Sequence, residues 1–154
     1  MITMASYLED YKNGVGASIA LDNFLINNPK HSLALAIKEI KNTIDGNKSF
    51  ADTIALLNVF NYKEFEIEEQ LLFLFNLFLL YINYERLSSA TSTYSIMKSI
   101  TSTSLPPEWQ IIHMQAKCEL LANAGNRKLR ALEIEKCLKV LPPQSGRYKT
   151  VYFV

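Results

Sequence analysis

Hydrophobic residues recur along this chain at the three- and four-residue spacing of amphipathic helices, and the alternation typical of strands is nearly absent. Glycine, proline and asparagine separate the periodic segments. The predicted helices cover about residues 2–12, 17–26, 33–44, 50–59, 63–84, 86–100, 108–123 and 127–140. We therefore predict an all-α fold, an antiparallel helical bundle of about six to eight helices.

The boundaries between these segments carry capping residues. Asn28-Pro29 supplies a cap followed by a proline in the first turn, and Gly46 is predicted to stop the helix that follows. Ser49 is the predicted N-cap of the next helix, with Asp52 complementing its dipole. The predicted buried faces are Ala17, Ala20, Leu21, Phe24 and Leu25; Leu33, Ile37, Ile40 and Ile44; and Phe50, Ile54, Leu57 and Val59.

The most apolar stretch runs from Leu71 to Ile82 and contains one polar residue, Asn76. A membrane-spanning helix needs about 20 apolar residues, and this stretch is shorter. Charged residues close it at both ends, at Glu69 and Glu85. We predict that it is the central buried helix of the bundle, touched by neighbours on nearly every side.

Composition places the chain among ordered globular proteins, because 49% of its 154 residues are hydrophobic and 20% are charged. Residues 1–102 carry 8 Lys/Arg against 11 Asp/Glu, a balance of −3, and residues 103–154 carry 8 against 4, a balance of +4. This split indicates either two faces of opposite sign that steer a partner or ordinary solvated helix surfaces. Cys118 and Cys137 lie at apolar helix positions, which favours free thiols in a reducing compartment.

No catalytic constellation is visible in the sequence. His31 and His113 lack a neighbouring Ser, Cys or Asp partner, and His31 is expected to lie exposed in the first turn of its helix. Neither a phosphate-binding loop nor a dinucleotide fingerprint is present, and no clustered histidine accompanies the cysteines. We expect a protein that is not an enzyme and that holds no metal and no cofactor.

One spacing occurs twice, a glycine followed after five residues by Ala-Leu. The copies are Gly14 with Ala20-Leu21 and Gly125 with Ala131-Leu132. Glycine allows a positive φ at a helix end, alanine allows two helix backbones to approach, and leucine fills the core. The motif predicts a helical hairpin and no chemistry of its own.

Residues Tyr7 to Glu69 resemble the cytoplasmic domain of the secretion F family. Members of this family are the inner-membrane platform proteins of type II secretion and type IV pilus systems. The resemblance rests on the Gly14 motif, Asn28-Pro29 between two helices, and the helix stop Gly46-Asn47-Lys48-Ser49-Phe50. The segment Gln115–Gly125 resembles the opening of a second copy. We accordingly divide the chain into a secretion-F-like domain, 1–102, and a short helical segment with an unplaced tail, 103–154.

The resemblance implies a non-enzymatic domain at the cytoplasmic face of the bacterial inner membrane. Its partners would be a cytosolic assembly ATPase and other inner-membrane assembly proteins, and it would link the ATPase to pilus or pseudopilus assembly or to protein secretion. A homo-oligomer is possible, nucleic acid is not expected, and membrane contact would come only through segments absent from this chain. No cofactor is implied.

Four acidic residues precede the predicted central helix: Glu64, Glu66, Glu68 and Glu69. They are either a docking face for a basic partner such as the ATPase, or a favourable complement to the helix dipole that also aids solubility. Arg127, Lys128 and Arg130 crowd the start of the last predicted helix, where positive charge is unfavourable. They indicate either an acidic partner or lipid head groups, or a solvated face.

An alternative interpretation is a tetratricopeptide-like chaperone or adaptor that binds a secreted protein. Ala90 with Tyr94, and Ala131 with Pro143, lie at offsets that such helix pairs use. The alanines are about 41 residues apart rather than about 34, and the large aromatic and glycine positions of the first helix are missing. Membrane attachment distinguishes the two interpretations, because an adaptor is soluble and needs a concave groove for a peptide.

Overall fold

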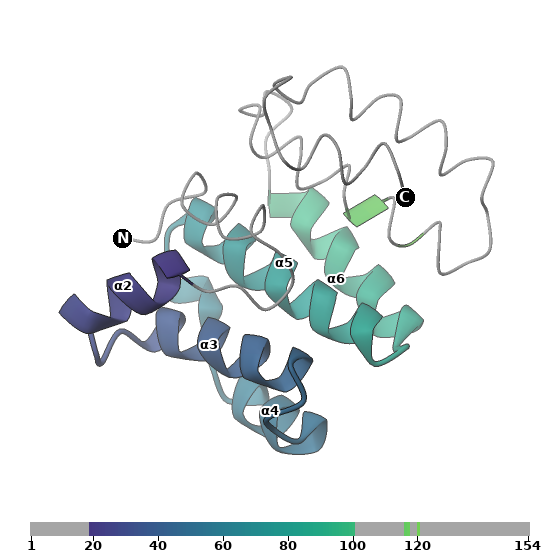
Figure 1. The fold of residues 1–154 in the computed structure, drawn as a ribbon. Coiled ribbons are helices and arrows are strands. Elements are labelled where there is room, and N and C mark those ends of the chain that lie inside the picture. The colour runs from purple at the N-terminus through teal and green to yellow at the C-terminus, as the bar shows by residue number, and fades with distance from the viewer. Residues whose placement is uncertain (1–18, 101–115, 118–119, 121–154) are drawn as a thin grey trace, which may run out of the picture.

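The computed structural model describes residues 19–100, 116–117 and 120. Every regular element within them is helical, which confirms the predicted all-α class (Figure 1). This part of the chain contains five α-helices, and the predicted helices over about 2–12 and 127–140 lie outside the described residues. The elements are α2 (Ile19–Asn27), α3 (Ser32–Ile44), α4 (Phe50–Asn58), the 3-10 helix η1 (Tyr62–Glu64), α5 (Ile67–Asn83) and α6 (Leu87–Ile100).

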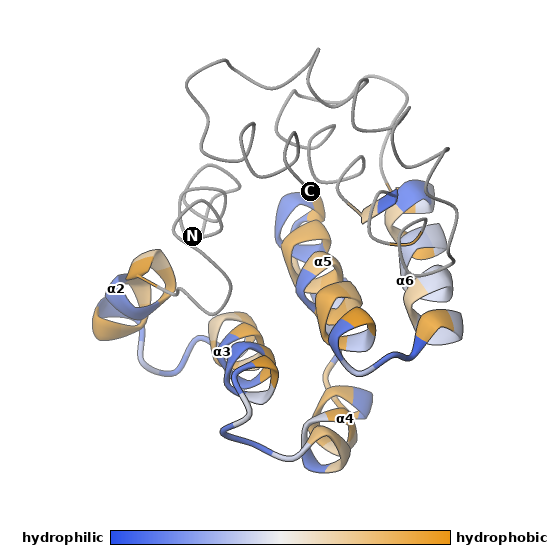
Figure 2. Ribbon diagram, turned by 45° about the vertical axis from the view of Figure 1, so that its right-hand side comes forward, coloured by the Kyte–Doolittle hydropathy of each residue, from blue (hydrophilic) through white to orange (hydrophobic). Residues whose placement is uncertain are grey.

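The apolar helix α5 lies between α3 and α6, as Figures 1 and 2 both show. Apolar residues cover most of its surface (Figure 2), and its neighbours bury them from several sides. This arrangement confirms the predicted central helix. Within the described residues, no helix combines the length and the apolar character that crossing a bilayer requires. The buried residues of α5 are Glu69, Leu71, Leu72, Phe73, Leu74, Phe75, Asn76, Phe78 and Leu80.

The helices do not all alternate in direction. A short turn connects α5 to α6, which returns antiparallel along it so that Tyr94 of α6 packs against Phe78 of α5. By contrast, α3 and α5 run parallel. His31 before α3 lies next to Glu69 at the start of α5, and Thr43 near the end of α3 bonds to Tyr84 after α5. The predicted antiparallel arrangement is therefore wrong for this pair, because α4 returns the chain before α5 begins.

The predicted boundary between α3 and α4 is confirmed. Gly46 has a φ of +83°, in the left-handed region, and its N–H donates to the Thr43 carbonyl at 3.1 Å. The N–H of Asn47 donates to the Asn42 carbonyl at 2.9 Å, which completes a Schellman motif. The hydroxyl of Ser49, two residues after Asn47, accepts the amide of Asp52 at 3.4 Å and caps α4.

The end of α5 has the same motif without a glycine. Glu85 has a φ of +58°, and its N–H donates to the Ile82 carbonyl at 3.1 Å. The N–H of Arg86 donates to the Tyr81 carbonyl at 2.8 Å. Glu85 therefore occupies the left-handed position at which glycine is strongly favoured, and its backbone is strained there.

The start of α5 differs from the prediction. The helix predicted over about residues 63–84 begins at Ile67, and Tyr62–Glu64 form a 3-10 helix instead. The Asn61 side chain explains the earlier turn, because its Oδ1 accepts the Lys63 amide at 3.3 Å and so caps this short helix.

Among the described residues most of the predicted buried faces are confirmed and Val59 is the exception, while Ala17 lies outside the described residues. Leu21, Leu33, Ile37 and Ile40 are buried, and the predicted apolar residues of α4 other than Val59 pack partly buried against the core. The side chain of Val59 is 84% exposed. Because Val59 follows Phe50 by nine residues, or two and a half helical turns, it lies on the side of α4 opposite the core face.

Candidate functional site

The four acidic residues predicted to form one docking face do not share one environment. Glu64 lies in η1, where its carboxylate accepts the Asn61 side-chain amide at 3.3 Å, and Glu66 is the exposed N-cap residue of α5. Glu68 is half-buried in the first turn, whereas Glu69 is buried, with 6% of its surface exposed. We define the acidic surface as Glu64, Glu66 and Glu68, because Glu69 faces the interior.

The predicted structural motif is described in part. Leu21 is buried, Ala20 is half-buried, and Gly46 ends α3 as expected. The other predicted motif and partner-binding residues lie outside the described residues, as do both cysteines and His113. These predicted residues are Gly14, Gly125, Arg127, Lys128, Arg130, Ala131 and Leu132.

His31 and Glu69 meet where the turn between α2 and α3 contacts the first turn of α5. The prediction that His31 lies exposed within α3 is wrong: it is the N-cap residue of α3, and its side chain is 26% exposed. Its Nδ1 accepts the backbone N–H of Ala34 at 3.2 Å. Its Nε2 lies 3.9 Å from Oε2 of Glu69, within ion-pair range and beyond hydrogen-bond length.

Aromatic side chains from two other segments hold the imidazole in place. The ring of Phe24 in α2 meets His31 nearly edge-on, with centroids 5.1 Å apart and planes at 85°. The ring of Phe65, just before α5, lies 5.9 Å from it. Glu69 in turn lies in the first turn of α5, where the helix dipole stabilises a carboxylate. The contacts therefore join α2, α3 and α5 at one end of the fold.

This arrangement limits the chemistry that His31 supports. An imidazole beside a carboxylate is a common arrangement for proton transfer. Here, however, one ring nitrogen accepts a backbone amide, so it is committed to capping α3. The described residues also hold no group of three or more His, Cys, Asp or Glu side chains that could bind a metal ion together. The geometry favours a role in structure.

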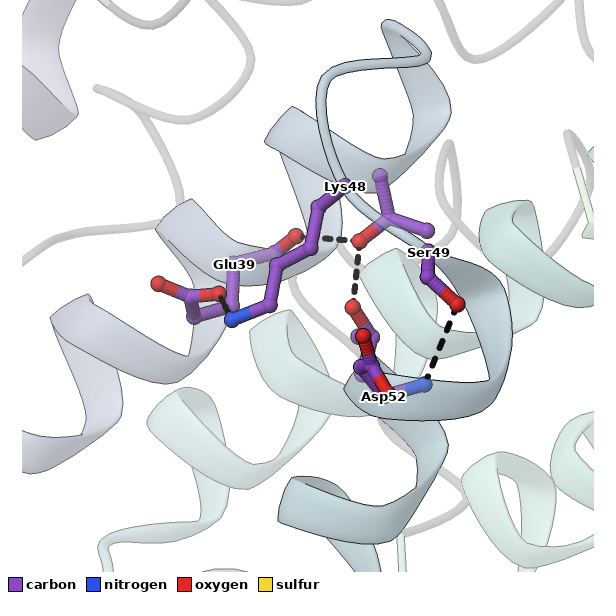
Figure 3. Close-up of polar contacts among 6 residues, drawn as sticks. Glu39, Lys48, Ser49 and Asp52 are labelled. Atoms are coloured by element: carbon purple, nitrogen blue, oxygen red, sulfur yellow. Dashed lines mark hydrogen bonds and ion pairs between the residues drawn. The ribbon is translucent and has the colours of Figure 1, made fainter.

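A second polar cluster joins α3, α4 and the end of α5. The hydroxyl of Thr43 donates to the Glu39 carbonyl at 2.8 Å, and Oγ1 of Thr53 lies 2.5 Å from Oγ1 of Thr43. The Tyr84 hydroxyl donates to the Thr43 carbonyl at 2.9 Å. Lys48, in the loop between α3 and α4, forms an ion pair with Glu39 (Figure 3). The cluster fixes the position of α4 on the side of α3.

Aromatic packing covers the same end of α5. The Phe50 ring in α4 lies 4.8 Å from the Tyr84 ring and 6.4 Å from the Tyr81 ring. The Arg86 guanidinium lies 5.4 Å from the centre of the Phe50 ring, a cation–π contact. Burial in this cluster raises the pKa of the Tyr81 hydroxyl, because it disfavours the phenolate.

Comparison of the chain with protein-family models, with curated proteins and with solved structures finds no match.

Proposed function

We propose that this chain is the non-enzymatic cytoplasmic part of a secretion-F-type platform protein. In this role it links an assembly ATPase to pilus or pseudopilus assembly or to protein secretion at the inner membrane. The observation that carries the proposal is the boundary between α3 and α4, where a left-handed Gly46 is followed by the Ser49 cap. The motif on which the resemblance rests thus has the local conformation expected of a helix stop and restart.

The position of the acidic surface supports a partner-binding role. Glu64, Glu66 and Glu68 lie at or just before the start of α5, which has more buried residues than any other helix of the described part of the chain. A basic partner bound there contacts an element that is packed against α3 and α6. Protein interiors are densely packed and transmit strain. A force that the partner applies to α5 should therefore reach the helices packed against it, rather than only move a loop.

The first test is fractionation of the native gene product, with its mass recorded. A membrane-bound product clearly heavier than the 17.6 kDa of this chain is the expected result. A product of 17.6 kDa that remains in the soluble fraction contradicts the platform role and favours the tetratricopeptide-like adaptor. In that case the next step is to identify a peptide bound to the purified protein.

The second test measures binding of the full chain to the assembly ATPase of the same cells. Replacing Glu64 and Glu66 by lysine should weaken binding at least about tenfold and reduce its salt dependence, since surface charges steer association. The matched control replaces Asp45 and Glu85 by lysine. Both are exposed, and they lie at the opposite ends of α3 and α5. Equal effects of the two double variants contradict a role for the acidic surface.

A further inference from the structure

The backbone N–H of Ala34 is buried and has an unusual acceptor. It belongs to the third residue of α3, and the first N–H groups of an α-helix have no partner within the helix. Ala34 is 0% exposed, so water does not replace a missing partner. The acceptor is Nδ1 of His31, at 3.2 Å. Serine, threonine, aspartate and asparagine are the usual N-caps, and they do not lose their acceptor at mildly acidic pH.

The cap defines the protonation state of the ring. A nitrogen that accepts a hydrogen bond carries no proton, so His31 is neutral here, with its proton on Nε2. That nitrogen faces the buried carboxylate of Glu69 at 3.9 Å. A second proton would occupy Nδ1, remove the acceptor from Ala34 and place a positive charge at the start of α3, where the helix dipole opposes it. The same proton would give Glu69 a full ion pair.

We propose that His31 is a proton-dependent cap, which holds the first turn of α3 when neutral and exchanges this contact for an ion pair with Glu69 when protonated. Protonation of a histidine side chain is a common basis of pH-dependent switches in proteins. Its consequence is a loosening of the turn between α2 and α3.

The charged groups around the ring determine how the exchange proceeds. From α5 the facing group is Glu69, whereas α2 and the segment before α5 contribute the uncharged rings of Phe24 and Phe65. On the same turn, Lys30 directly precedes His31 in the sequence. A second ion pair, between Asp22 of α2 and Lys38 of α3, spans 2.9 Å. This pair does not involve His31, so the contact between α2 and α3 does not depend on the cap alone.

The test is amide hydrogen exchange of the full chain, followed by NMR at about pH 8 and about pH 5. We expect the protection of the Ala34 amide, relative to that of Ile40 in the middle of α3, to fall at least about tenfold on acidification, since a buried unpaired N–H is costly. Nitrogen chemical shifts of the ring should show the proton on Nε2 at the higher pH. Unchanged relative protection, or a proton on Nδ1 at about pH 8, overturns the proposal.

Two variants separate the cap from the ion pair. In His31→Asn the side chain caps α3 without titrating, so the relative protection of Ala34 should be the same at both pH values. A fall as large as that of the unmodified chain overturns the proposal. In Glu69→Gln the protonated ring has no carboxylate to pair with, so the loss of protection should begin at a lower pH. An unchanged onset contradicts the part assigned to Glu69.

Discussion

The hydroxyl groups of Thr43 and Thr53 lie 2.5 Å apart at the buried junction of α3 and α4. Both residues are 0% exposed. Thr43 uses its hydroxyl hydrogen in the bond to the Glu39 carbonyl, so the hydrogen between the two threonines must come from Thr53. The Thr43 hydroxyl thus donates to the Glu39 carbonyl and accepts from Thr53, while the Thr53 hydroxyl donates to Thr43.

This asymmetry predicts unequal effects of two Thr→Val substitutions on the free energy of unfolding in urea. Thr43→Val removes both bonds and leaves the buried Thr53 donor unpaired, which should cost about 2–3 kcal/mol. Thr53→Val removes one bond and should cost about 1 kcal/mol. The double variant should lose less than the sum of the two, because no buried donor remains. Thr91→Val, at an exposed position of α6, is the control and should change stability by less than about 0.5 kcal/mol.

The two Schellman motifs predict opposite effects of adding and removing a glycine. Glu85→Gly should raise stability by about 0.5–1 kcal/mol, since relief of the left-handed strain exceeds the cost of a freer unfolded chain. Gly46→Ala should lower stability by a similar amount through its left-handed φ alone, because an added Cβ meets no heavy atom within 4 Å beyond its own chain neighbours. Glu85→Ala retains the strain and should match the unmodified chain. Thermal melting of the three variants checks this order, and a stabilising Glu85→Ala would point to charge instead of conformation.

The raised pKa of Tyr81 predicts part of the response to alkali. Because the folded-state pKa lies above the unfolded value of about 10, the group stabilises the fold below that pH, and this stabilisation is lost as pH rises through the folded-state pKa. Tyr81→Phe should therefore lose less stability than the unmodified chain between about pH 9 and about pH 11. Urea unfolding across this range measures the difference, and parallel curves for the two proteins would contradict it.

The aromatic cluster next to α5 should be the most sensitive part of the described core. The ring of Phe73 is buried and lies 5.2 Å from Phe60 and 5.3 Å from Tyr62. Phe73→Ala should cost about 3–5 kcal/mol, and Phe73→Leu clearly less. Leu56→Ala on the exposed face of α4 is the matched control and should cost less than about 0.5 kcal/mol. Similar losses for the buried and the exposed site, measured by urea unfolding, would show that α5 is not the centre of the core.

Local patterns predict some of the elements whose cause is local. The predicted cap at Asn28, with Pro29 in the first turn, is wrong because His31 caps α3. Gly46 and Ser49 act within one turn of their own positions, so the boundary between α3 and α4 followed from residue type and spacing. Apolar residues of α5 cover more than one face of the helix, and this pattern predicts a helix at the centre of the core. The predicted start of α5 was wrong because the Asn61 cap directs the chain into a 3-10 helix first.

Local sequence patterns do not predict the contact between His31 and Glu69, because the contact joins segments that are distant in the sequence. His31 and Glu69 are separated in the sequence by α3, α4 and η1, and neither belongs to a motif that points to the other. Histidine is also an uncommon N-cap, so its role did not follow from capping preference. Glu69 is a neighbour of Glu64, Glu66 and Glu68 in the sequence, and only the helical turn of α5 directs it inward.

The parallel arrangement of α3 and α5 has a consequence for the order of folding. The α5–α6 hairpin closes through a short turn, whereas the bond from Tyr84 to Thr43 closes a loop of 41 residues. Loop closure costs entropy before its contacts contribute, so the hairpin should form in the transition state and α3 should join it later. Substitutions at Phe78 should then slow folding, while those at Thr43 should mainly speed unfolding. Stopped-flow measurement of folding and unfolding rates for Phe78→Ala and Thr43→Val would test this order. A slower folding rate for Thr43→Val would show that α3 already packs in the transition state.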